Sequence, residues 1–311
     1  MSPRQAGGAT QGVPVAGPSF YRAHGLGNDY LVFEGREGDG AQGWPVRPEA
    51  VRAVCHRLTG VGSDGIVVLM DAEPAPDAPF PLRMFNPDGS EFERSGNGLR
   101  ILAAYLHRSG RVGQAPFQVR SGGSLIRMQV HDVTREGRFD ISVEMGRARV
   151  SPDSVGLQER EPEADALPAL KHPELGAVVF QPVSVGNPHA VVFGQDLSTE
   201  TLHALGPFLS SHPAFARGTN VQLARVAGPG RVEIAIWERG VGPTTASGTS
   251  SCAAAVAAVR QGRLEPGPIQ VIMEGGTLKV TVSPSLDVVL RGPVQEVVRG
   301  ELLPGFVQML G

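Results

Sequence analysis

Two segments far apart in the chain share one layout, and this internal repeat constrains the fold more than any other feature. The first reads FNPDGSEFERSGNGLRILAAY, and the second reads WERGVGPTTASGTSSCAAAVAAV. In each, an apolar residue is followed by a polar one, Asn86 or Glu238. A Ser-Gly pair stands nine positions later, at Ser95 or Ser247, and opens an Ala-rich helical segment. This correspondence predicts an internal duplication.

Short apolar runs separated by turns make up most of the remaining chain. Each half also places an Asn in a Gly turn, at Gly27-Asn28 and Gly186-Asn187, which extends the repeat. The apolar runs favour a strand-rich architecture. Helical periodicity is visible in four segments, residues 48–58, 98–107, 198–210 and 250–259. The sequence therefore predicts an α+β protein with two similar domains and a ligand site in the cleft between them.

The composition excludes several classes of protein. The 311 residues are 41% hydrophobic and 19% charged, which is typical of a globular protein with a buried core. The net charge is −3 without a basic block, so we expect no nucleic-acid partner. No apolar run is long enough to span a membrane, and residues 1–20 lack the apolar core of a secretory signal. We expect a soluble, cytoplasmic protein whose residues 1–17 form a flexible tail.

The two Ser-Gly segments form the first candidate site. A serine followed by glycine at a helix start lies beside unpaired backbone N–H groups and the positive end of the helix dipole. Such a terminus binds a carboxylate or a phosphate, although helix capping is the commoner role of a single serine there. In a duplicated fold, Ser95-Gly96-Asn97-Gly98 and Ser247-Gly248-Thr249-Ser250 would converge on one ligand from opposite sides.

Polar side chains in the loops suit a zwitterionic ligand. The set comprises Asn28, Asn86, Asn187, Asn220, Glu238 and Arg239. Arginine and helix N-termini bind a carboxylate, whereas Glu and Asn bind an ammonium group. Each Asn alone also fits a structural turn, and Glu238 with Arg239 also fits an ion pair at the surface. Together they predict a small-molecule amino-acid ligand.

Other reactive residue types give weaker signals. His24 and His189 lie beside turns, and the closeness of His189 to Asn187 makes it a candidate base. No cluster of His, Cys or carboxylates has metal-ligand spacing, so we expect no metal. The Gly-rich HGLGND and GVGSDG segments match no nucleotide-binding motif, so we expect no cofactor. Cys55 and Cys252 lie on apolar helical faces, which predicts buried and unreactive thiols.

Taken in order, the motifs resemble those of diaminopimelate epimerases. They are HGLGNDY at 24–30, GVGSDG at 60–65, FNPDGSE at 85–91, SGNGLR at 95–100, VGNPHA at 185–190, TNV at 219–221, WERGVG at 237–242, SGTSSCAA at 247–254 and EGGTLKV at 274–280. Each Gly-rich piece alone is common in proteins. The ordered set covers nearly the whole chain and is specific.

The resemblance implies the fold and the reaction class. It implies two strand-rich barrels, each around a central helix, formed by residues 18–145 with the returning segment 293–311 and by residues 146–292. It also implies an epimerase of amino-acid biosynthesis that needs neither pyridoxal phosphate nor metal and interconverts LL- and meso-diaminopimelate. In the family, two cysteines at the helix starts act on opposite faces of Cα, one removing a proton while the other delivers one. The resemblance points only weakly to a homodimer.

The chain departs from the family at these two positions. Ser95 and Ser247 stand where the family has its cysteines, and Pro243 stands where the family usually has Glu. An alcohol is a far weaker acid than a thiol, so each serine needs a neighbouring base. His189 and Glu238 are the candidates for that role. The amides at 96–97 and 248–249 and the loop residues named above are retained for substrate binding.

Three hypotheses remain open from the sequence. The first is an amino-acid epimerase or racemase in which the serines, assisted by His189 or Glu238, replace the thiols. The second is an isomerase or dehydratase on the same fold that needs one acid-base group. The third is a non-catalytic relative that binds an amino acid. Exchange of the Cα proton with solvent separates the first two from the third.

Overall fold

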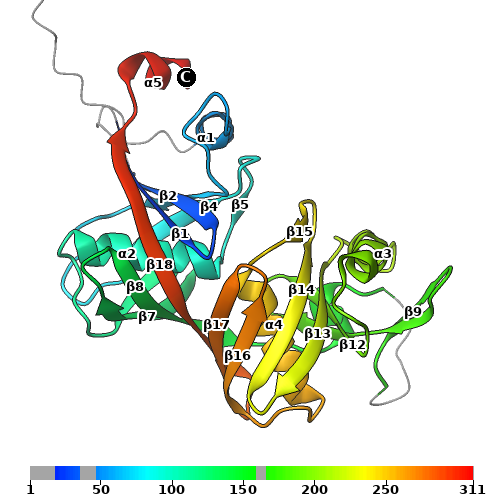
Figure 1. The fold of residues 1–311 in the computed structure, drawn as a ribbon. Helices are drawn as coiled ribbons and strands as arrows, with labels where there is room; N and C mark the ends of the chain where they lie inside the picture. The colour runs from blue at the N-terminus through cyan, green and yellow to red at the C-terminus, as the bar shows by residue number, and fades with distance from the viewer. Residues whose placement is uncertain (1–17, 36–46, 159–165, 311) are drawn as a thin grey trace, which may run out of the picture.

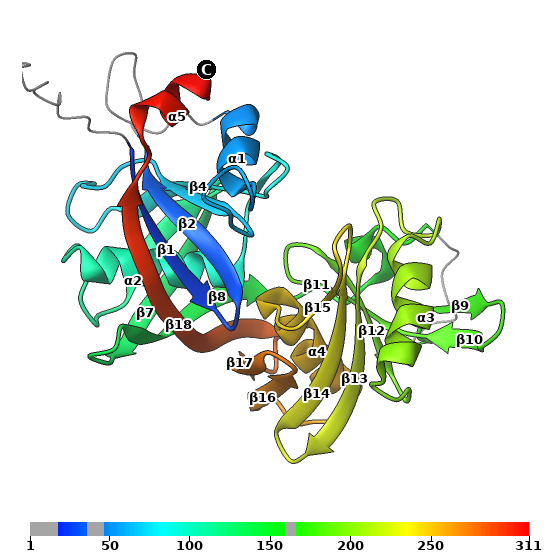
Figure 2. The ribbon, with the colours of Figure 1, turned by 45° about the horizontal axis from the view of Figure 1, so that its top comes forward.

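The structure is a computed structural model that describes residues 18–35, 47–158 and 166–310 (Figure 1). The predicted tail, residues 1–17, lies outside the described residues. Two strand-rich units lie side by side, each with a helix at its centre (Figures 1 and 2). The predicted α+β architecture is therefore confirmed.

The first unit is a closed barrel of eight strands. In sheet order these are β1 (Ser19–Gly25), β2 (Asn28–Glu34), β3 (Ile66–Leu69), β4 (Phe80–Phe85), β6 (Phe117–Ser121), β7 (Ser124–Val133), β8 (Arg138–Arg147) and β18 (Asp287–Glu301), with β18 pairing back to β1. Helix α2 (Gly96–Arg108) fills the barrel and contacts β1, β2, β7, β8 and β18. Short strand β5 (Glu91–Phe92) pairs with β4, while α1 (Pro48–Cys55) and α5 (Pro304–Met309) pack outside.

The second unit wraps its sheet around helix α4 (Gly248–Arg260). Its strands are β11 (Gln181–Ser184), β12 (Pro188–Phe193), β13 (Asn220–Gly228), β14 (Arg231–Glu238), β15 (Gly242–Thr244), β16 (Gly267–Met273) and β17 (Gly276–Val282). Helix α3 (Thr199–Ser210) packs against β13 and β14, and the 3-10 helix η1 (Pro152–Val155) contacts β11. Strands β9 (Ala169–His172) and β10 (Gly176–Val179) pair with each other as a separate two-stranded sheet.

The two units repeat the same connections. Strands β2 and β3 run parallel in the first unit, as β12 and β13 do in the second. Likewise β4 is parallel to β6, and β14 is parallel to β16, with the central helix between the two strands in the chain. The internal repeat predicted from the Ser-Gly segments thus extends over the surrounding strands. The exact domain boundaries stay a prediction.

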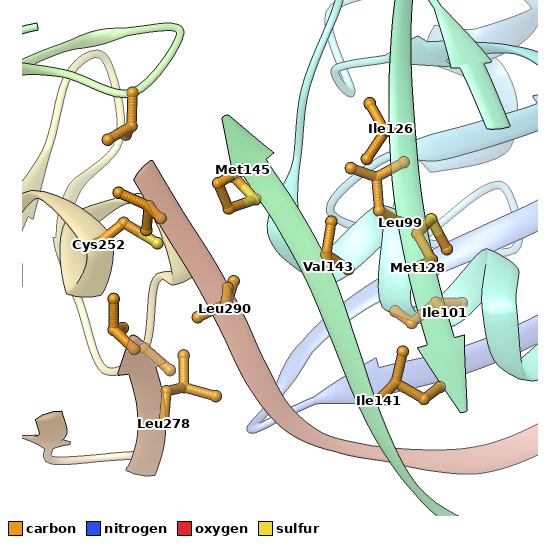
Figure 3. Packing of buried hydrophobic residues seen from close by; sticks show 14 of the residues in the cluster. Leu99, Ile101, Ile126, Met128, Ile141, Val143, Met145, Cys252, Leu278 and Leu290 are labelled. Atoms are coloured by element: carbon orange, nitrogen blue, oxygen red, sulfur yellow. The ribbon is translucent and has the colours of Figure 1, made fainter. Parts of the chain in front are cut away.

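Strand β18 joins the two units. Its first residues pair with β17 and β8, and its last residues pair with β1 (Figure 2). On this strand Leu290 lies between Cys252 of α4 and the β8 residues Val143 and Met145 (Figure 3). These residues belong to one hydrophobic cluster that includes both central helices. The apolar core therefore fixes α2 and α4 relative to each other.

The helices begin earlier than the apolar periodicity predicts. Helix α2 begins at Gly96 and α4 at Gly248, each two residues before the predicted start. Their first turns contain glycine and polar residues, which carry no apolar signal but continue the helix from the capping serine. Cys55 and Cys252 are buried, as predicted. None of the helices among the described residues is long and apolar enough to cross a membrane.

Candidate active site

Both predicted serines cap their helices. Ser95 accepts a hydrogen bond from the Gly98 backbone nitrogen at 3.1 Å, and Ser247 accepts one from the Ser250 nitrogen at 3.4 Å. Neither helix has an acidic residue in its first turn. The caps therefore leave the first two N–H groups of each helix, and the positive end of each dipole, without compensation from the helix itself.

The two helix starts meet at their first glycines. A methyl group added to Gly96 would lie 3.7 Å from the Gly248 Cα atom, and one added to Gly248 would lie 3.5 Å from the Gly96 Cα atom. The same methyl groups would lie 2.4 Å and 2.9 Å from Leu290 Cδ2. The contacts with the opposite Cα atoms are ordinary van der Waals distances, whereas those with Leu290 are overlaps, so glycine at both positions leaves room for Leu290 against the two adjoining helix starts.

A buried arginine lies under this junction. Arg100 of α2 is 0% exposed, and its Nη1 atom lies 3.8 Å from the positions of the methyl groups considered above on Gly96 and Gly248. Its Nη2 atom donates to Asn97 Oδ1, while Nε and Nη1 have no hydrogen-bond partner within the described parts of the chain. Burial lowers the pKa of Arg100 to about 10, so the guanidinium is still charged at neutral pH.

A chain of hydrogen bonds links buried Arg100 to Asp64 nearer the surface. Arg100 can only donate, so Asn97 accepts through Oδ1 and donates its amide nitrogen to Asn28 Oδ1 at 2.7 Å. The Asn28 amide nitrogen in turn donates to Asp64 at 3.0 Å, and Arg57 donates to the same carboxylate at 2.6 Å. This polar chain fixes which way the Asn97 and Asn28 amides point, and both are predicted ligand residues.

Each serine has a different acidic neighbour. Glu238, the last residue of β14, lies close enough to Ser247 for the serine hydroxyl to lower the pKa of its carboxyl group. Tyr30 on β2 lies close enough to Ser95 for that hydroxyl to lower the pKa of its phenol. The Tyr30 ring is held against the start of α2, since a methyl group added to Gly98 would lie 3.2 Å from it. Glu238 is thus a neighbour of Ser247 and Tyr30 a neighbour of Ser95, and the catalytic role of Glu238 stays a prediction.

The surroundings raise the pKa of both neighbours. Burial chiefly raises the pKa of Glu238, although the hydrogen bond from Ser247 lowers it, and the negative charge of Asp64 raises it further. Burial is also the main reason that the pKa of Tyr30 is raised, with the charges of Glu238 and Asp64 adding to it. Glu238 is therefore a stronger base than an exposed carboxylate, and Tyr30 is held as a neutral phenol.

His189 lies behind the site. It is 0% exposed, and its Nε2 atom hydrogen-bonds with Asn187 Oδ1 at 2.8 Å. Asn187 donates to Thr249 Oγ1, in the first turn of α4, at 3.5 Å. Burial lowers the pKa of His189 to about 3, so the imidazole is neutral. The contacts of His189 lead to the predicted ligand residues Asn187 and Thr249 and to neither serine, so this geometry fits a positioning residue.

The remaining predicted ligand residues divide into two groups. Asn220 donates to the Pro188 carbonyl oxygen at 3.0 Å and accepts from the Arg239 nitrogen at 3.0 Å, so it ties the ends of β12 and β14 together. The Arg239 side chain is exposed and donates to the Arg217 carbonyl oxygen at 2.7 Å. Asn86 instead donates to Ser90 within its own turn at 3.0 Å.

Comparison with known proteins identifies the family of the chain. The family model for diaminopimelate epimerase matches residues 20–151 and 182–297. The diaminopimelate epimerase of Desulforudis audaxviator is 38% identical over 284 residues, which cover 91% of this chain and 98% of the relative. Diaminopimelate epimerase 2 of Nostoc sp. is 36% identical over 283 residues, covering 91% and 95%. The chain belongs to the diaminopimelate epimerase family.

Solved structures share the fold of this family. A hydroxyproline epimerase from Agrobacterium vitis superposes with a TM-score of 0.64 at 14% identity and covers 92% of both chains. A phenazine biosynthesis protein of the PhzF family from Bacillus anthracis gives a TM-score of 0.60 at 13% identity, covering 92% of this chain and 99% of its own. The diaminopimelate epimerase family is a family of isomerases, and its fold is shared with these more distant proteins.

Sequence reasoning missed three residues of this site. Tyr30, Asp64 and Arg100 lie within the motifs of the family, yet no local pattern assigns them a role. The signal for Arg100 is a charged residue between Leu99 and Ile101 in an otherwise apolar helix, which indicates a buried charge. Tyr30 and Asp64 gain their roles only from contacts that the fold creates.

Proposed function

We propose that the chain is a cofactor-independent amino-acid epimerase that interconverts LL- and meso-diaminopimelate or the epimers of a related amino acid. The reaction breaks and re-forms the Cα–H bond of a substrate held between α2 and α4. The helices belong to different units, so the two faces of Cα meet residues from different halves of the chain.

The observation that carries this proposal is the contact between the starts of the two helices. The N–H groups of Gly96 and Asn97 and those of Gly248 and Thr249 provide donors for one carboxylate. The buried charge of Arg100 adds positive potential at the same place. Removing a Cα proton places negative charge on that carboxylate, and preorganised donors stabilise it most in the transition state.

The proton-transfer groups are the two serines with their neighbours. Serine is too weak an acid to ionise alone, so Ser247 acts together with Glu238, which takes up its proton. Ser95, with Tyr30 behind it, faces the substrate from the other helix. His189 and Asn187 position Thr249 at the start of α4. Asn28, Asn220 and Arg239 remain proposed ligands of the amino acid, Asn for its ammonium group and Arg for a carboxylate.

The test is a direct assay of stereochemistry. LL-diaminopimelate and a panel of single amino acids are incubated with the protein, and the stereoisomers are separated on a chiral column. We expect enzyme-dependent formation of the epimer, and at least a ~100-fold lower rate for Ser247→Ala, because general acid-base groups contribute about that much. No epimer from any substrate, or an unchanged rate for Ser247→Ala, would contradict the proposal.

A second candidate is an isomerase that moves a proton between two atoms on one face of its substrate. The observation in its favour is that the two serines have different neighbours, since Ser247 affects the pKa of Glu238 and Ser95 affects the pKa of Tyr30. Such an enzyme would rearrange an unsaturated acid and leave the configuration of amino acids unchanged. The same chiral assay, run beside an assay for double-bond migration, separates the two.

A further inference from the structure

We propose that Leu26 is a positioning residue whose side chain holds the tip of the β1–β2 hairpin against the second unit, so that Asn28 and the start of α2 keep their place relative to the start of α4. The kinetic part of this inference rests on the proposed epimerase function. The contact of Leu26 with the second unit can be tested without any reaction.

Leu26 has a backbone conformation that leucine rarely adopts. Together with Gly27 it forms the two-residue loop of the hairpin, between the paired residues Gly25 and Asn28. Both loop residues have a positive φ angle, 55° at Leu26 and 92° at Gly27. Such loops favour Asn, Asp and Gly, because the Cβ atom of other residues crowds the following carbonyl oxygen. A leucine persists in this conformation when its surroundings hold it there.

The side chain of Leu26 contacts the second unit. Leu26 is half-buried and packs against the hydrophobic cluster that contains both central helices. A methyl group added to Gly276, the first residue of β17, would lie 2.8 Å from Leu26 Cδ2. Leu26 therefore fills the space that a side chain at position 276 would occupy. The loop between β1 and β2 accordingly points toward β17 (Figures 1 and 2).

The two sides of this contact lead to the two halves of the candidate site. In the second unit, the Gly275 nitrogen donates to the Thr245 carbonyl oxygen at 2.8 Å, and Thr245 precedes Ser247 by two residues. In the first unit, Asn28 follows the hairpin loop and accepts a hydrogen bond from the Asn97 amide nitrogen at 2.7 Å. Asn97 is in the first turn of α2. The contact therefore couples the segments that carry the two helix starts.

This contact is separate from the shared core along β18. Leu290 joins the units through that core, whereas Leu26 joins them through the tip of a hairpin (Figure 3). A single contact region allows two units to rotate about it, and a second region fixes the angle between them. A displacement of 1 Å in a reacting group costs about 100-fold in rate. Loss of the Leu26 contact should therefore affect the reaction more than folding.

The test compares Leu26→Gly with a matched control, Leu286→Gly. Glycine at position 26 removes the side chain and suits the positive φ angle, so the hairpin itself is expected to form as well as before. Leu286 also has a positive φ angle, 65°, is half-buried and packs against the same cluster. It lies in the turn that follows β17, whereas Gly276 begins that strand. The two variants therefore make the same change at opposite ends of β17.

Amide hydrogen exchange, followed by mass spectrometry, measures the contact without a substrate. We expect peptides that cover residues 245–249 and 274–277 to exchange at least ~10-fold faster in Leu26→Gly than in the unchanged protein, because their local opening is no longer opposed from the first unit. In Leu286→Gly the same peptides should exchange at the original rate. Unchanged exchange of these peptides in Leu26→Gly would overturn the proposal, whatever the activity.

Kinetics then test the positioning role with a substrate found in the chiral assay. We expect kcat to fall at least ~10-fold in Leu26→Gly, at a melting temperature close to that of Leu286→Gly. An unchanged kcat, or an equal loss of kcat in both variants, would show that Leu26 has no positioning role. Absence of an epimer from every amino acid removes the proposed function and the kinetic part of this inference, while the exchange experiment still decides whether Leu26 holds the two units together.

Discussion

At the scale of single residues, the geometry of the candidate site depends on the absence of a side chain at Gly96 and at Gly248. Gly96 and Gly248 have no side chain, so their helices approach each other over Leu290. Ser95 and Ser247 are similar caps, yet Tyr30 and Glu238 make them chemically different. Two nearly symmetric helix starts therefore have different neighbours at their capping serines.

Gly96→Ala tests the approach of the helices. The new methyl group would lie 2.4 Å from Leu290 Cδ2, so the Leu290 side chain must shift from its place against the two helix starts. We expect a loss of about 1–3 kcal/mol in the free energy of unfolding, as in other overpacked cores, together with a marked loss of activity. Gly113→Ala, at a position with no atom within 4 Å, is the matched control. Equal stability and activity of the two variants would show that the contact has no importance.

The pH dependence of activity tests Glu238. Its pKa is raised, chiefly by burial and also by Asp64, and the ionised form is the base. Activity should therefore rise with pH through a midpoint above the ordinary value for Glu, near 4.5. Because the folded state holds this proton more tightly than the unfolded state does, the stability from Glu238 falls over the same pH range.

The variant Asp64→Asn tests whether the negative charge of Asp64 raises the pKa of Glu238. Removal of its negative charge lowers the pKa of Glu238, so the midpoint in the pH profile of kcat/KM should move to lower pH. His189 has a pKa of about 3 and does not titrate in this range. A midpoint that stays fixed in Asp64→Asn but moves in His189→Gln would contradict the assignment of the titration to Glu238.

At the scale of elements, helix α2 carries the binding and orienting groups of the first unit. Its cap is Ser95, its first N–H groups face the junction, and Arg100 reaches back under both helix starts. The chain of hydrogen bonds from Arg100 through Asn97 and Asn28 to Asp64 has one direction only. Helix α2 thus sets the orientation of the Asn28 side chain at the start of β2. No local sequence pattern predicts this orientation.

Arg100→Met separates this orienting role from stability. Two nitrogens of Arg100 have no hydrogen-bond partner among residues 18–35, 47–158 and 166–310, and replacement of a poorly paired buried charge by an apolar side chain is often neutral or stabilising. We expect an unchanged or higher melting temperature and a KM raised ~10-fold, because Asn97 and Asn28 lose their fixed orientation and the carboxylate loses positive potential. Arg127→Met, at an exposed arginine, is the control. An unchanged KM with a lower melting temperature would assign Arg100 a purely structural role.

At the scale of the whole molecule, strand β18 makes one site from two similar units. It completes the first barrel through β1 and β8 and continues the second sheet through β17. Leu290, between the two units, contributes to the shared apolar core (Figure 3). Since both central helices pack in that core, the distance between their starts is a property of the entire fold.

The internal repeat and its two central helices could be predicted from the sequence alone, because Ser-Gly starts and apolar periodicity are local signals. The repeat also singles out Glu238, which precedes Ser247 by the same number of residues as Asn86 precedes Ser95, and its role stays a prediction. The neighbour of Ser95 could not be predicted from the sequence, since Tyr30 lies 65 positions earlier and comes close to Ser95 only when the barrel forms. The side-chain contact of Asn86 was also not predicted: its amide nitrogen donates to Ser90 within the same turn.

The most direct test of the account is a crystal structure of the protein with diaminopimelate bound. We predict that one carboxylate lies within hydrogen-bonding distance of N–H groups from both helix starts, Gly96-Asn97 and Gly248-Thr249, with its Cα between Ser95 and Ser247. A bound amino acid that contacts only one helix start, or that lies with its Cα away from both serines, would contradict the account.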